Sequence, residues 1–452
     1  MLRRLTSSPT APLLLLAVLS VLSLGARALL LDEPCMSPCR HASDHTLVFD
    51  EAYYVNAARV IAGINPPAGS HYTGDPTGTD PNAEHPQGVK LIIAGSIELF
   101  GDGPFAWRLG SLLFGSLAIL GLFVLARAAG AGRWQALGAC ALMACDNLLL
   151  VHGRIGTLDI YVAAAMIWGV ALYIRGSPIL AGLTLAVGAC FKLVAPYAIA
   201  VLVLLELIRT LVARRGANDR ADWRAGAALR RLAACVVPGT VVFFVLLWVM
   251  GMIATPYDDS TSTLITGGPF AHFSHMLSYA AHQTSPHGPK GIASYPWQWM
   301  FDYKPITYLR INPSLPGDGL FAVHPTAHFL GFVSPPIMLL AIPSSIFGAV
   351  SLVRARRARA VASGQDATDR QLAIVGIAWF LGTFLPFELL SLIYSRTSYL
   401  YYMVIVMPGF YVSIVYLVAR ARRHKVALAL AALWALAVLV AAVLMFPFTP
   451  AL

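Results

Sequence analysis

Two adjacent carboxylates, Asp50 and Glu51, open an amphipathic segment that ends near residue 62. A carboxylate at the start of a helix can cap that helix and interact favourably with its dipole. It can also act as a general base, provided that it lies within hydrogen-bond reach of the proton it takes. Both roles are open from the sequence, and the second would place a base at a membrane surface.

A second polar group follows at Glu84, His85 and Lys90, in a segment where Pro86 suits the first turn of a helix. Glu84 can cap that helix, and Lys90 can extend its ammonium group towards lipid headgroups. The same three side chains can instead line a pocket for a donor or an acceptor.

Four cations, Arg108, Arg154, Lys192 and Arg396, each lie at one end of an apolar run. Extension of the side chain to the interface explains any one of them, but charges at membrane depth are costly unless they face a cavity or a partner. Gathered on one side of the membrane, the four could bind a phosphate, which Arg does through two hydrogen bonds. Asp159 could pair with Arg154 or orient a sugar.

A further stretch runs from His282 to Leu309 and is rich in aromatic side chains. Trp297, Trp299, Tyr303 and Tyr308 can anchor a loop at the membrane interface, as aromatic belts do. Beside histidine and lysine they would equally suit a pocket for a sugar and a lipid phosphate.

Cys35 and Cys39 form the motif C-M-S-P-C just after the first apolar run, and both a disulfide and two free thiols fit this placement. With His41 and His45 they could bind zinc, but the spacing matches no strong zinc template. A divalent metal is therefore possible but not predicted. The remaining cysteines lie in apolar runs and are expected in the core: Cys140, Cys145, Cys190 and Cys235.

The elements that position these residues follow from composition: of 452 residues, 58% are hydrophobic and only 12% are charged, against about 25% charged in soluble proteins. This excludes a disordered chain, a collagen and an ordinary soluble enzyme. It predicts an all-α polytopic membrane protein with about eleven transmembrane helices in one domain, residues 1–452. The apolar runs cover residues 11–31, 105–126, 134–151, 157–174, 178–191, 194–213, 233–254, 326–352, 372–390, 401–418 and 427–447.

The distribution of charge predicts the orientation. With a cytoplasmic N-terminus, most of the 32 Lys and Arg residues lie in inner loops, so the net charge of +10 is a topology signal and not a nucleic-acid site. The first run, after Arg3 and Arg4, is interpreted as a retained anchor and not a signal peptide. Two extracytoplasmic loops, 32–104 and 255–325, hold most histidines and many acidic residues. The expected location is the plasma membrane, with the active site outside.

The first of these loops also predicts secondary structure. Residues 50–62 and 86–100 are amphipathic and too short to cross a membrane, so we expect two short helices that lie in the interface.

Taken in order, these segments resemble the protein O-mannosyltransferases and their bacterial relatives, which are glycosyltransferases of the membrane C-type fold that use a polyprenyl-phosphate sugar. The resemblance extends from about residue 45 to about residue 415, and a close cousin is the bacterial transferase that moves aminoarabinose to lipid A. The motifs that carry it are the Asp-Glu pair, H-P-x-x-x-K, W-R-L-G-S-L-L-F-G, R-I-x-x-L-D, F-K-L-V-A-P-Y, P-W-Q-W and S-R-x-x-Y-L-Y-Y.

The resemblance implies an enzyme that moves mannose from dolichyl- or polyprenyl-phosphate mannose to Ser/Thr hydroxyls of proteins, with inversion at the anomeric carbon. Asp50 would take the proton of the acceptor hydroxyl, and Glu51 would support Asp50 or position the acceptor. No cofactor or metal is required, because the leaving group is already a good phosphate. The cations that would hold the lipid phosphate are Arg108, Lys192, Arg396 and Arg154.

Some positions depart from the family pattern. His85 and Lys90 match the family's H-P-P-L-G-K helix, but Gln87 replaces its second Pro, and G-R-I-G replaces the usual S-R-I-A. The second outer loop is too short for the β-trefoil insert of the eukaryotic enzymes. These departures favour a prokaryotic enzyme and leave the acceptor open between a protein and a lipid or glycan hydroxyl. A secondary transporter or lipid flippase, and a subunit of another transferase, are hypotheses from other classes.

Overall fold

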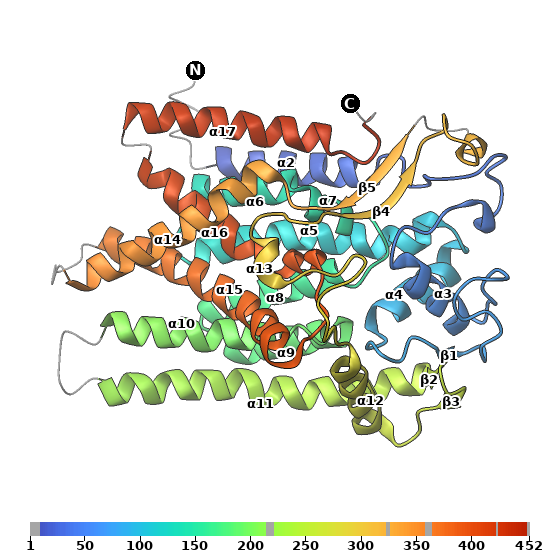
Figure 1. The fold of residues 1–452 in the computed structure, drawn as a ribbon. Helices are drawn as coiled ribbons and strands as arrows, with labels where there is room; N and C mark the ends of the chain where they lie inside the picture. Colours follow the sequence, from blue (N-terminus) through green and yellow to red (C-terminus); the bar gives the residue numbers. More distant parts are fainter. Residues whose placement is uncertain (1–9, 214–220, 322–325, 358–363, 422–423, 450–452) are drawn as a thin grey trace.

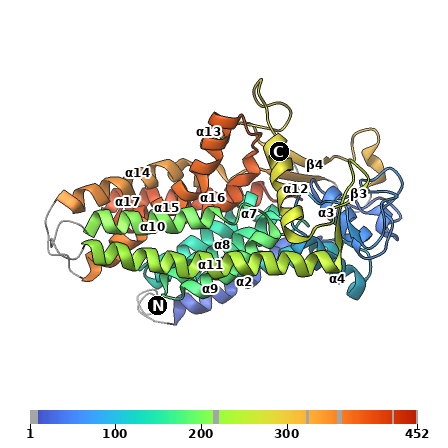
Figure 2. The same ribbon diagram turned by 90° about the horizontal axis from the view of Figure 1, so that it is seen from below.

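Long helices run side by side in the computed structural model, and shorter elements gather at one end of this bundle (Figure 1, Figure 2). The structure describes residues 10–213, 221–321, 326–357, 364–421 and 424–449, so Arg3 and Arg4 lie outside the described residues. The helices are α2 (Ala11–Ala28), α3 (Glu51–Ile61), α4 (Gly88–Phe100), α5 (Pro104–Ala128), α6 (Arg133–Cys145), α7 (Asn147–His152), α8 (Asp159–Ile174), α9 (Pro178–Phe191), α10 (Tyr197–Ala213), α11 (Ala221–Ile253), α12 (Gly268–His282), α13 (Pro296–Trp299), α14 (Pro335–Arg357), α15 (Gly364–Tyr394), α16 (Met403–Ala421) and α17 (Lys425–Leu444).

Each of the eleven predicted apolar runs contains a helix, as their continuous apolar composition requires. Within the described residues, seven helices are long and apolar enough to cross a membrane, namely α2, α5, α11, α14, α15, α16 and α17, while α8 and α9 are apolar but shorter. The chain is therefore a multi-pass membrane protein with a helical fold. The number of eleven crossings stays a prediction.

Two of the predicted runs differ from the structure. The run predicted over 326–352 begins with strand β5 (Ala327–Gly331), and α14 starts only at Pro335. Buried and half-buried positions alternate with a period of two along β5, which is the pattern of a strand with one covered face. The run predicted over 134–151 breaks at Asp146, whose side chain accepts a backbone N–H and caps α7.

The fold is mostly helical, as predicted, and the segments 32–104 and 255–325 add a few short strands that the sequence did not predict. Helices α3 and α4 confirm the two short helices predicted for the first loop, but two small sheets accompany them. In one sheet β1 pairs in parallel with β2, which pairs antiparallel with β3, and in the other β4 and β5 form an antiparallel hairpin. Because β1 comes from the first loop and β2 from the second, their pairing joins the two loops. The remaining strands and short helices are β1 (Thr79–Asp80), β2 (Thr255–Asp258), β3 (Thr263–Leu264), β4 (Ile306–Ile311), η1 (Ala42–Asp44), η2 (Asp318–Leu320) and η3 (Leu400–Tyr402).

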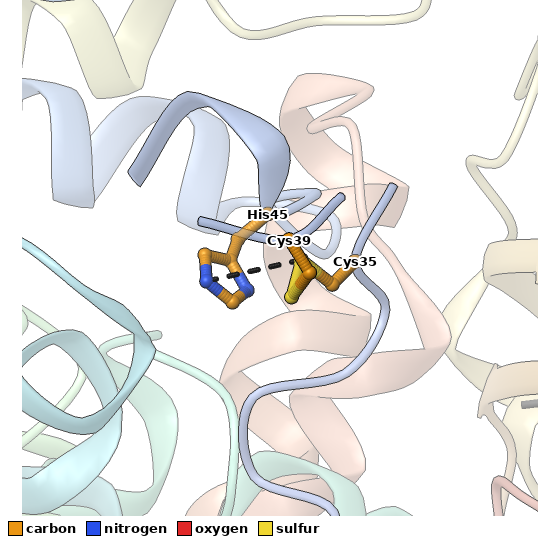
Figure 3. Close-up of side chains that lie close together, drawn as sticks. All are labelled: Cys35, Cys39 and His45. Atoms are coloured by element: carbon orange, nitrogen blue, oxygen red, sulfur yellow. Dashed lines mark hydrogen bonds between the residues drawn. A yellow bond between two sulfur atoms is a disulfide. The ribbon is translucent and has the colours of Figure 1, made fainter. Parts of the chain in front are cut away.

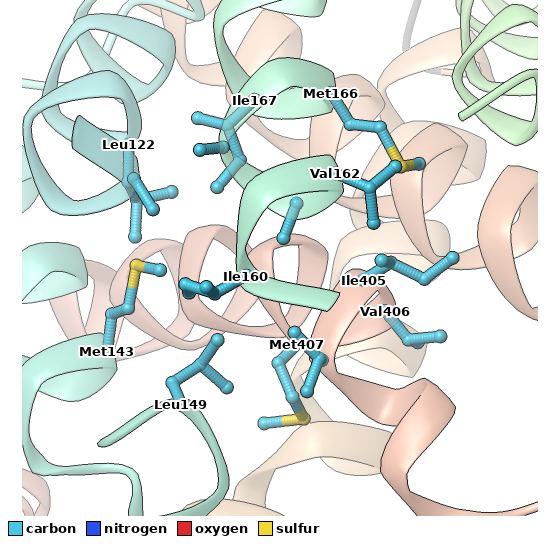
Figure 4. Close-up of a cluster of buried hydrophobic side chains, with 14 of the residues drawn as sticks. Leu122, Met143, Leu149, Ile160, Val162, Met166, Ile167, Ile405, Val406 and Met407 are labelled. Carbon is cyan, nitrogen blue, oxygen red and sulfur yellow. The ribbon is translucent and has the colours of Figure 1, made fainter. Parts of the chain in front are cut away.

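Helix α8 lies in the centre of the bundle because apolar residues cover its whole circumference. Figure 4 shows its side chains packed among those of α5, α6 and α16. Small residues bring other helices together: a Cβ added at Gly182 of α9 would lie 2.0 Å from the carbonyl oxygen of Cys235 in α11. Cys235 is also buried, as are Cys140 and Cys190, and Cys145 is partly buried. The labelled side chains are Leu122, Met143, Leu149, Ile160, Val162, Met166, Ile167, Ile405, Val406 and Met407.

Candidate active site

A cavity of about 290 Å³ lies between the two loops, 32–104 and 255–325, and the adjoining ends of the bundle helices. Its walls come from the start of α3, the segment before α4, the end of α9, the second outer loop with α12, and the connection from α15 to η3. The cavity brings together five residues that the sequence predicted for the site, which are Asp50, Glu84, His85, Lys192 and Arg396.

Asp50 occupies the N-cap position of α3, yet its side chain makes no capping hydrogen bond there. The residue before it, Phe49, has a positive φ of 55°, a conformation that costs a non-glycine residue about 1–3 kcal/mol. Packing must therefore hold it in place. The Phe49 ring stacks on Tyr308 at a centroid distance of 4.1 Å and meets Tyr401 edge-on at 5.5 Å. These contacts fix the direction in which Asp50 leaves the backbone.

The Asp50 carboxylate is half-buried and, among the described residues, has no hydrogen bond or ion pair. Burial raises its pKa to about 7, the positive charge of Lys192 opposes this shift, and the negative charge of Asp159 adds to it. A carboxylate with a pKa near neutrality and no fixed partner can accept a proton from a bound hydroxyl. The geometry thus suits the base role better than the capping role.

Glu51, although adjacent in sequence, points away from the cavity and into a buried ion pair. Its two carboxylate oxygens accept hydrogen bonds from Nε and Nη2 of Arg108, both at 2.8 Å. The same oxygens also accept the backbone N–H groups of Val48 and Gly156 at 2.8 Å. Arg108 is 1% exposed and further donates to the backbone carbonyls of the segment around Glu33. Arg108 does not line the cavity; instead, this pair joins α5 to the loop that carries Asp50.

Lys192 lies at the C-cap of α9, where the backbone becomes extended and turns the side chain towards the cavity. Its Nζ donates to Asp159 Oδ1 at 2.6 Å and lies 5.1 Å from the ring centroids of both Tyr401 and Tyr402. Of the two roles left open for Asp159, an ion pair with Arg154 is not observed, because Asp159 pairs with Lys192 instead; a role in orienting a sugar stays a prediction. The ammonium group remains on the cavity wall, where it can meet an anion.

Arg396 reaches the cavity from the segment that follows α15. Neighbouring backbone bonds hold this segment against the second outer loop: Ser285 N–H donates to Ser395 O, and Thr397 N–H donates to Gln283 O. The Arg396 guanidinium donates to the backbone carbonyl of Ala280 at the end of α12. Its remaining N–H groups stay available on the cavity wall.

Arg154 lies apart from the cavity. It donates to the backbone carbonyls of Leu29 and Leu30, and its guanidinium lies 5.4 Å and 4.8 Å from the ring centroids of Phe329 and Phe448. These contacts join the end of α2 to β5. Of the four predicted phosphate ligands, the structure therefore brings Lys192 and Arg396 to the cavity, and Arg108 and Arg154 elsewhere.

Lys90 is fully buried and does not reach headgroups. Its Nζ forms an ion pair with Asp80 at 2.6 Å and donates to the backbone carbonyls of Asn82 and His85. His85 itself lines the cavity, and burial together with nearby Lys192 keeps the pKa of its ring well below the usual value. His85 is therefore neutral at pH 7, and Lys90 fixes the segment that carries it.

The aromatic stretch of the second loop splits between surface and core. Trp297 is 51% exposed and Tyr303 is exposed, as anchors at an interface would be. Trp299 and Tyr308, predicted as anchors too, are buried instead: Trp299 packs against the rings of α15 and η3, and Tyr308 donates to or accepts from His152 Nε2 at 2.8 Å. His282 is exposed at the end of α12. None of the predicted His282, Trp297 and Trp299 lines the cavity.

Several cavity residues were not predicted, most of them tyrosines. Tyr399, Tyr401 and Tyr402 belong to the S-R-x-x-Y-L-Y-Y motif, and Tyr53 and Tyr54 follow the Asp-Glu pair, but none of them was predicted as a site residue. Asn82 also lines the cavity, and nothing in its turn-rich surroundings marked it. The unpredicted residues of the cavity wall include Tyr53, Tyr54, Asn82, Tyr279, Tyr399, Tyr401 and Tyr402.

Figure 3 shows the group of side chains that could hold a metal ion in the described part of the chain, Cys35, Cys39 and His45. The structure forms a disulfide between the two cysteines, which decides the alternative left open by the sequence, and Cys35 Sγ lies 3.9 Å from His45 Nε2. A disulfide offers no thiolate to a metal, so the donor set fits zinc only after reduction.

A second, apolar groove of about 410 Å³ runs along α9, α10 and α11. Leu193 and Pro196, which line it, follow Lys192 directly in the chain. The lining of the groove thus includes the chain neighbour of Lys192, which lines the polar cavity. This arrangement suits a ligand with an apolar tail and an anionic head.

The comparison with protein families concerns part of the chain. Residues 84–236 match the family model described as dolichyl-phosphate-mannose-protein mannosyltransferase. The resemblance inferred from the motifs is confirmed over these residues. The matched residues include Glu84, His85, Arg108, Asp159 and Lys192.

Individual relatives agree with this family match. A polyprenol-phosphate-mannose–protein mannosyltransferase from Corynebacterium glutamicum is 34% identical over 119 residues, which make up 26% of this chain and 22% of that protein. The aligned part thus spans about a fifth of that relative.

Solved structures extend the agreement to the fold. The structure of the S. cerevisiae protein O-mannosyltransferase Pmt1-Pmt2 complex bound to the sugar donor superposes with a TM-score of 0.71 at 12% identity, over 97% of this chain and 90% of that chain. The oligosaccharyltransferase AglB from Archaeoglobus fulgidus superposes with a TM-score of 0.55 at 12% identity, over 97% of this chain and 56% of that chain. At these identities the agreement concerns the fold, and the fold is that of polytopic membrane glycosyltransferases.

Proposed function

We propose that this chain is an inverting glycosyltransferase that moves mannose from polyprenyl-phosphate mannose to Ser/Thr hydroxyls of proteins. The proposal includes a plasma-membrane location, a cytoplasmic N-terminus and an extracytoplasmic active site. The observation that carries it is one cavity in which an unpaired carboxylate, Asp50, shares the wall with two cations, Lys192 and Arg396. The family match and the mannosyltransferase from C. glutamicum support the choice of donor and acceptor.

The chemistry follows from this arrangement. The acceptor oxygen forms a bond to the anomeric carbon of the sugar while the bond from that carbon to the phosphate oxygen breaks. Asp50 takes the proton of the acceptor hydroxyl, and the polyprenyl phosphate leaves with one more negative charge. A single displacement from the side opposite to the leaving group inverts the anomeric carbon.

The two cations act on the leaving group. Because negative charge grows on the phosphate as the bond breaks, Lys192 and Arg396 stabilise the transition state more than the bound donor. Both are held by the protein before the substrate arrives, Lys192 through Asp159 and Arg396 through the backbone of α12. The energy of reorganising these groups is then small.

The apolar groove along α9, α10 and α11 gives the polyprenyl tail a place beside the same lysine. A tail in this groove stays in the apolar region of the bilayer while its phosphate reaches the polar cavity. The donor would then bind at the boundary between lipid and water, which fits the half-buried position of Asp50.

The test is transfer of radiolabelled mannose from synthetic polyprenyl-phosphate mannose to a Ser/Thr-rich peptide by the purified full chain. Asp50→Asn should reduce transfer by at least about 10²-fold, the lower end for a missing general base. Asp32→Asn, which changes an exposed carboxylate of the same loop, is the matched control and should transfer normally. An Asp50→Asn protein as fast as the wild type would remove Asp50 from the mechanism.

A wild-type protein that transfers no mannose, but carries a lipid-linked sugar into proteoliposomes, would replace the proposal by a transporter. Transfer to a lipid or glycan hydroxyl and not to the peptide would change only the acceptor.

A further inference from the structure

Two side chains that line the cavity, Asn82 and Glu84, carry hydrogen-bond acceptors. Asn82 is 1% exposed, and its Nδ2 donates to Glu84 Oε1 at 2.7 Å and to the hydroxyl oxygen of Tyr72 at 2.9 Å. Because only the amide nitrogen can donate to a carboxylate, Glu84 determines the orientation of the Asn82 amide. Asn82 Oδ1 is then turned the other way.

Asn82 Oδ1 is buried and has no hydrogen-bond partner among the described residues. An unpaired buried acceptor costs free energy, and such an atom in a cavity wall is satisfied when a ligand supplies a donor. Glu84 lines the same cavity and keeps further acceptor positions on its two oxygens beyond the bond from Asn82. This part of the cavity wall therefore presents hydrogen-bond acceptors, which favour a ligand that carries hydrogen-bond donors.

The backbone of this wall is held rigidly. Lys90 donates to the carbonyl oxygens of Asn82 and His85, and Asp80 accepts a hydrogen bond from the backbone N–H of Asn82 at 3.2 Å. An isolated bridge to Asp258 ties Asn82 to the second loop. Since Lys90 and Asp80 neutralise each other, they position the segment without adding net charge to the cavity. Preorganised polar groups lose little entropy when a ligand binds.

The charges that line the cavity select the orientation of a ligand. A phosphate has acceptors and negative charge, so it is repelled by Glu84 and attracted by Lys192 and Arg396. A pyranose ring carries several hydroxyl donors and no charge. We propose that Asn82 and Glu84 form the sugar-recognition subsite, in which Asn82 Oδ1 and the Glu84 carboxylate accept hydrogen bonds from hydroxyl groups of the transferred sugar. This inference rests on the proposed function and adds to it the residues that recognise the sugar.

Binding experiments test the subsite separately from transfer. Two probes are compared on the full chain in detergent, polyprenyl phosphate and polyprenyl-phosphate mannose, by direct titration. Glu84→Gln keeps an oxygen that can accept from Asn82, so the local structure is preserved, but it removes the charge. Its affinity for the mannose-bearing probe should fall about tenfold to about a hundredfold, the loss of a hydrogen bond to a charged group, while its affinity for polyprenyl phosphate stays within about twofold.

Three further proteins complete this comparison. Glu98→Gln makes the same change at an exposed position of α4 and should bind both probes as the wild type does. Asn82→Ser shortens the second acceptor and should lose affinity for the mannose probe alone. Lys192→Gln should weaken both probes, because it touches the shared phosphate.

Donors that lack single hydroxyl groups identify the contact. The donors compared carry 2-, 3-, 4- or 6-deoxymannose. For one of them, the wild type should bind about as weakly as Glu84→Gln binds the full mannose donor. Glu84→Gln should bind that same deoxy donor and the mannose donor with equal affinity. Equal loss with both probes, no loss, or the same loss for every deoxy donor in Glu84→Gln would overturn the subsite. A wild-type protein that binds both probes but transfers no mannose refutes the proposed function and leaves the subsite standing.

Discussion

Arg108 and Glu51 form the ion pair whose removal gives the sharpest prediction. Both residues occur in motifs of the resemblance, and a phosphate-binding role for Arg108 competes with the structural role that its contacts show. The perturbation is a double-mutant cycle of Arg108→Met, Glu51→Leu and the double variant. Met and Leu have volumes close enough to the originals to keep the interior filled.

The magnitude follows from burial. At 1% and 0% exposure, removing one partner leaves an uncompensated charge inside the protein, which costs about 3–5 kcal/mol. Arg108→Met should lie at the lower end, because Glu51 keeps the N–H groups of Val48 and Gly156. Glu51→Leu leaves the guanidinium with backbone carbonyls only, so it should lie higher. The double variant buries no charge and should lose less than the sum of the singles by about 1–3 kcal/mol.

The assay is unfolding of the purified protein in mixed micelles, followed by the titration of polyprenyl phosphate onto each variant that stays folded. A positional role predicts a large coupling energy and little change in affinity for the phosphate when Arg108 is replaced. Lys192→Gln, measured beside it, should lose affinity for the phosphate. Additive costs within about 0.5 kcal/mol, or a larger loss of phosphate affinity for Arg108→Met than for Lys192→Gln, would refute the reasoning.

Further predictions concern the base, its support and the first outer loop. Because burial raises the pKa of Asp50 to about 7 from 3.8, the rate of transfer should rise with pH up to about 7 and level off above; a rate that stays constant from pH 5 to pH 8 would contradict this. Because the pKa of Asp50 is raised in the folded state, its carboxyl group is least unfavourable to folding at low pH, and the folded state becomes less stable as pH rises through about 7. Asp50→Asn carries no such charge and should therefore unfold at a higher temperature than the wild type at pH 8. Tyr308→Phe keeps the stack on Phe49 but loses the hydrogen bond to His152, and should cost about 1 kcal/mol of stability, whereas Tyr308→Ala should also lower kcat. Cys35→Ser should lower the free energy of unfolding by about 2 kcal/mol relative to the oxidised wild type, the value of the loop-closure model for a short loop. Relative to the reduced wild type, the variant should show no difference.

The sequence predicted elements wherever one physical property decides them. Continuous apolar runs located a helix in each of eleven places, because a backbone in lipid must satisfy its hydrogen bonds internally. The exceptions arise where side chains compete with that rule. Asp146 bonds to the backbone and starts a new helix, and the segment at 327–331 becomes a strand because β4 is beside it. A hydropathy pattern shows neither the backbone bond of Asp146 nor the pairing of β5 with β4.

Only some of the site residues were predicted correctly, because the position of a charged residue in a motif does not reveal which residue it pairs with. Arg108 and Lys192 stand in similar apolar surroundings in the sequence, yet Glu51 neutralises Arg108 within the interior, whereas Lys192 stays on a cavity wall. The partner of Arg108 is 57 residues away in the chain. Only the fold decides this. The same holds for Lys90, whose partner Asp80 precedes the motif that contains it.

Under the proposed function, the division of these charges accounts for donor binding and sugar transfer in one cavity. Two buried pairs, Arg108 with Glu51 and Lys90 with Asp80, hold the loops in place away from the cavity lining. Lys192 is also paired, with Asp159, but it lines the cavity together with Arg396. In the proposed function, Lys192 and Arg396 attract the phosphate, while Glu84, which lines the same cavity, repels it. These charges favour a donor whose phosphate lies at the two cations and whose sugar lies towards Glu84. Changing a residue of either of the two buried pairs should disturb the position of every group at once, and changing a wall residue should disturb one contact.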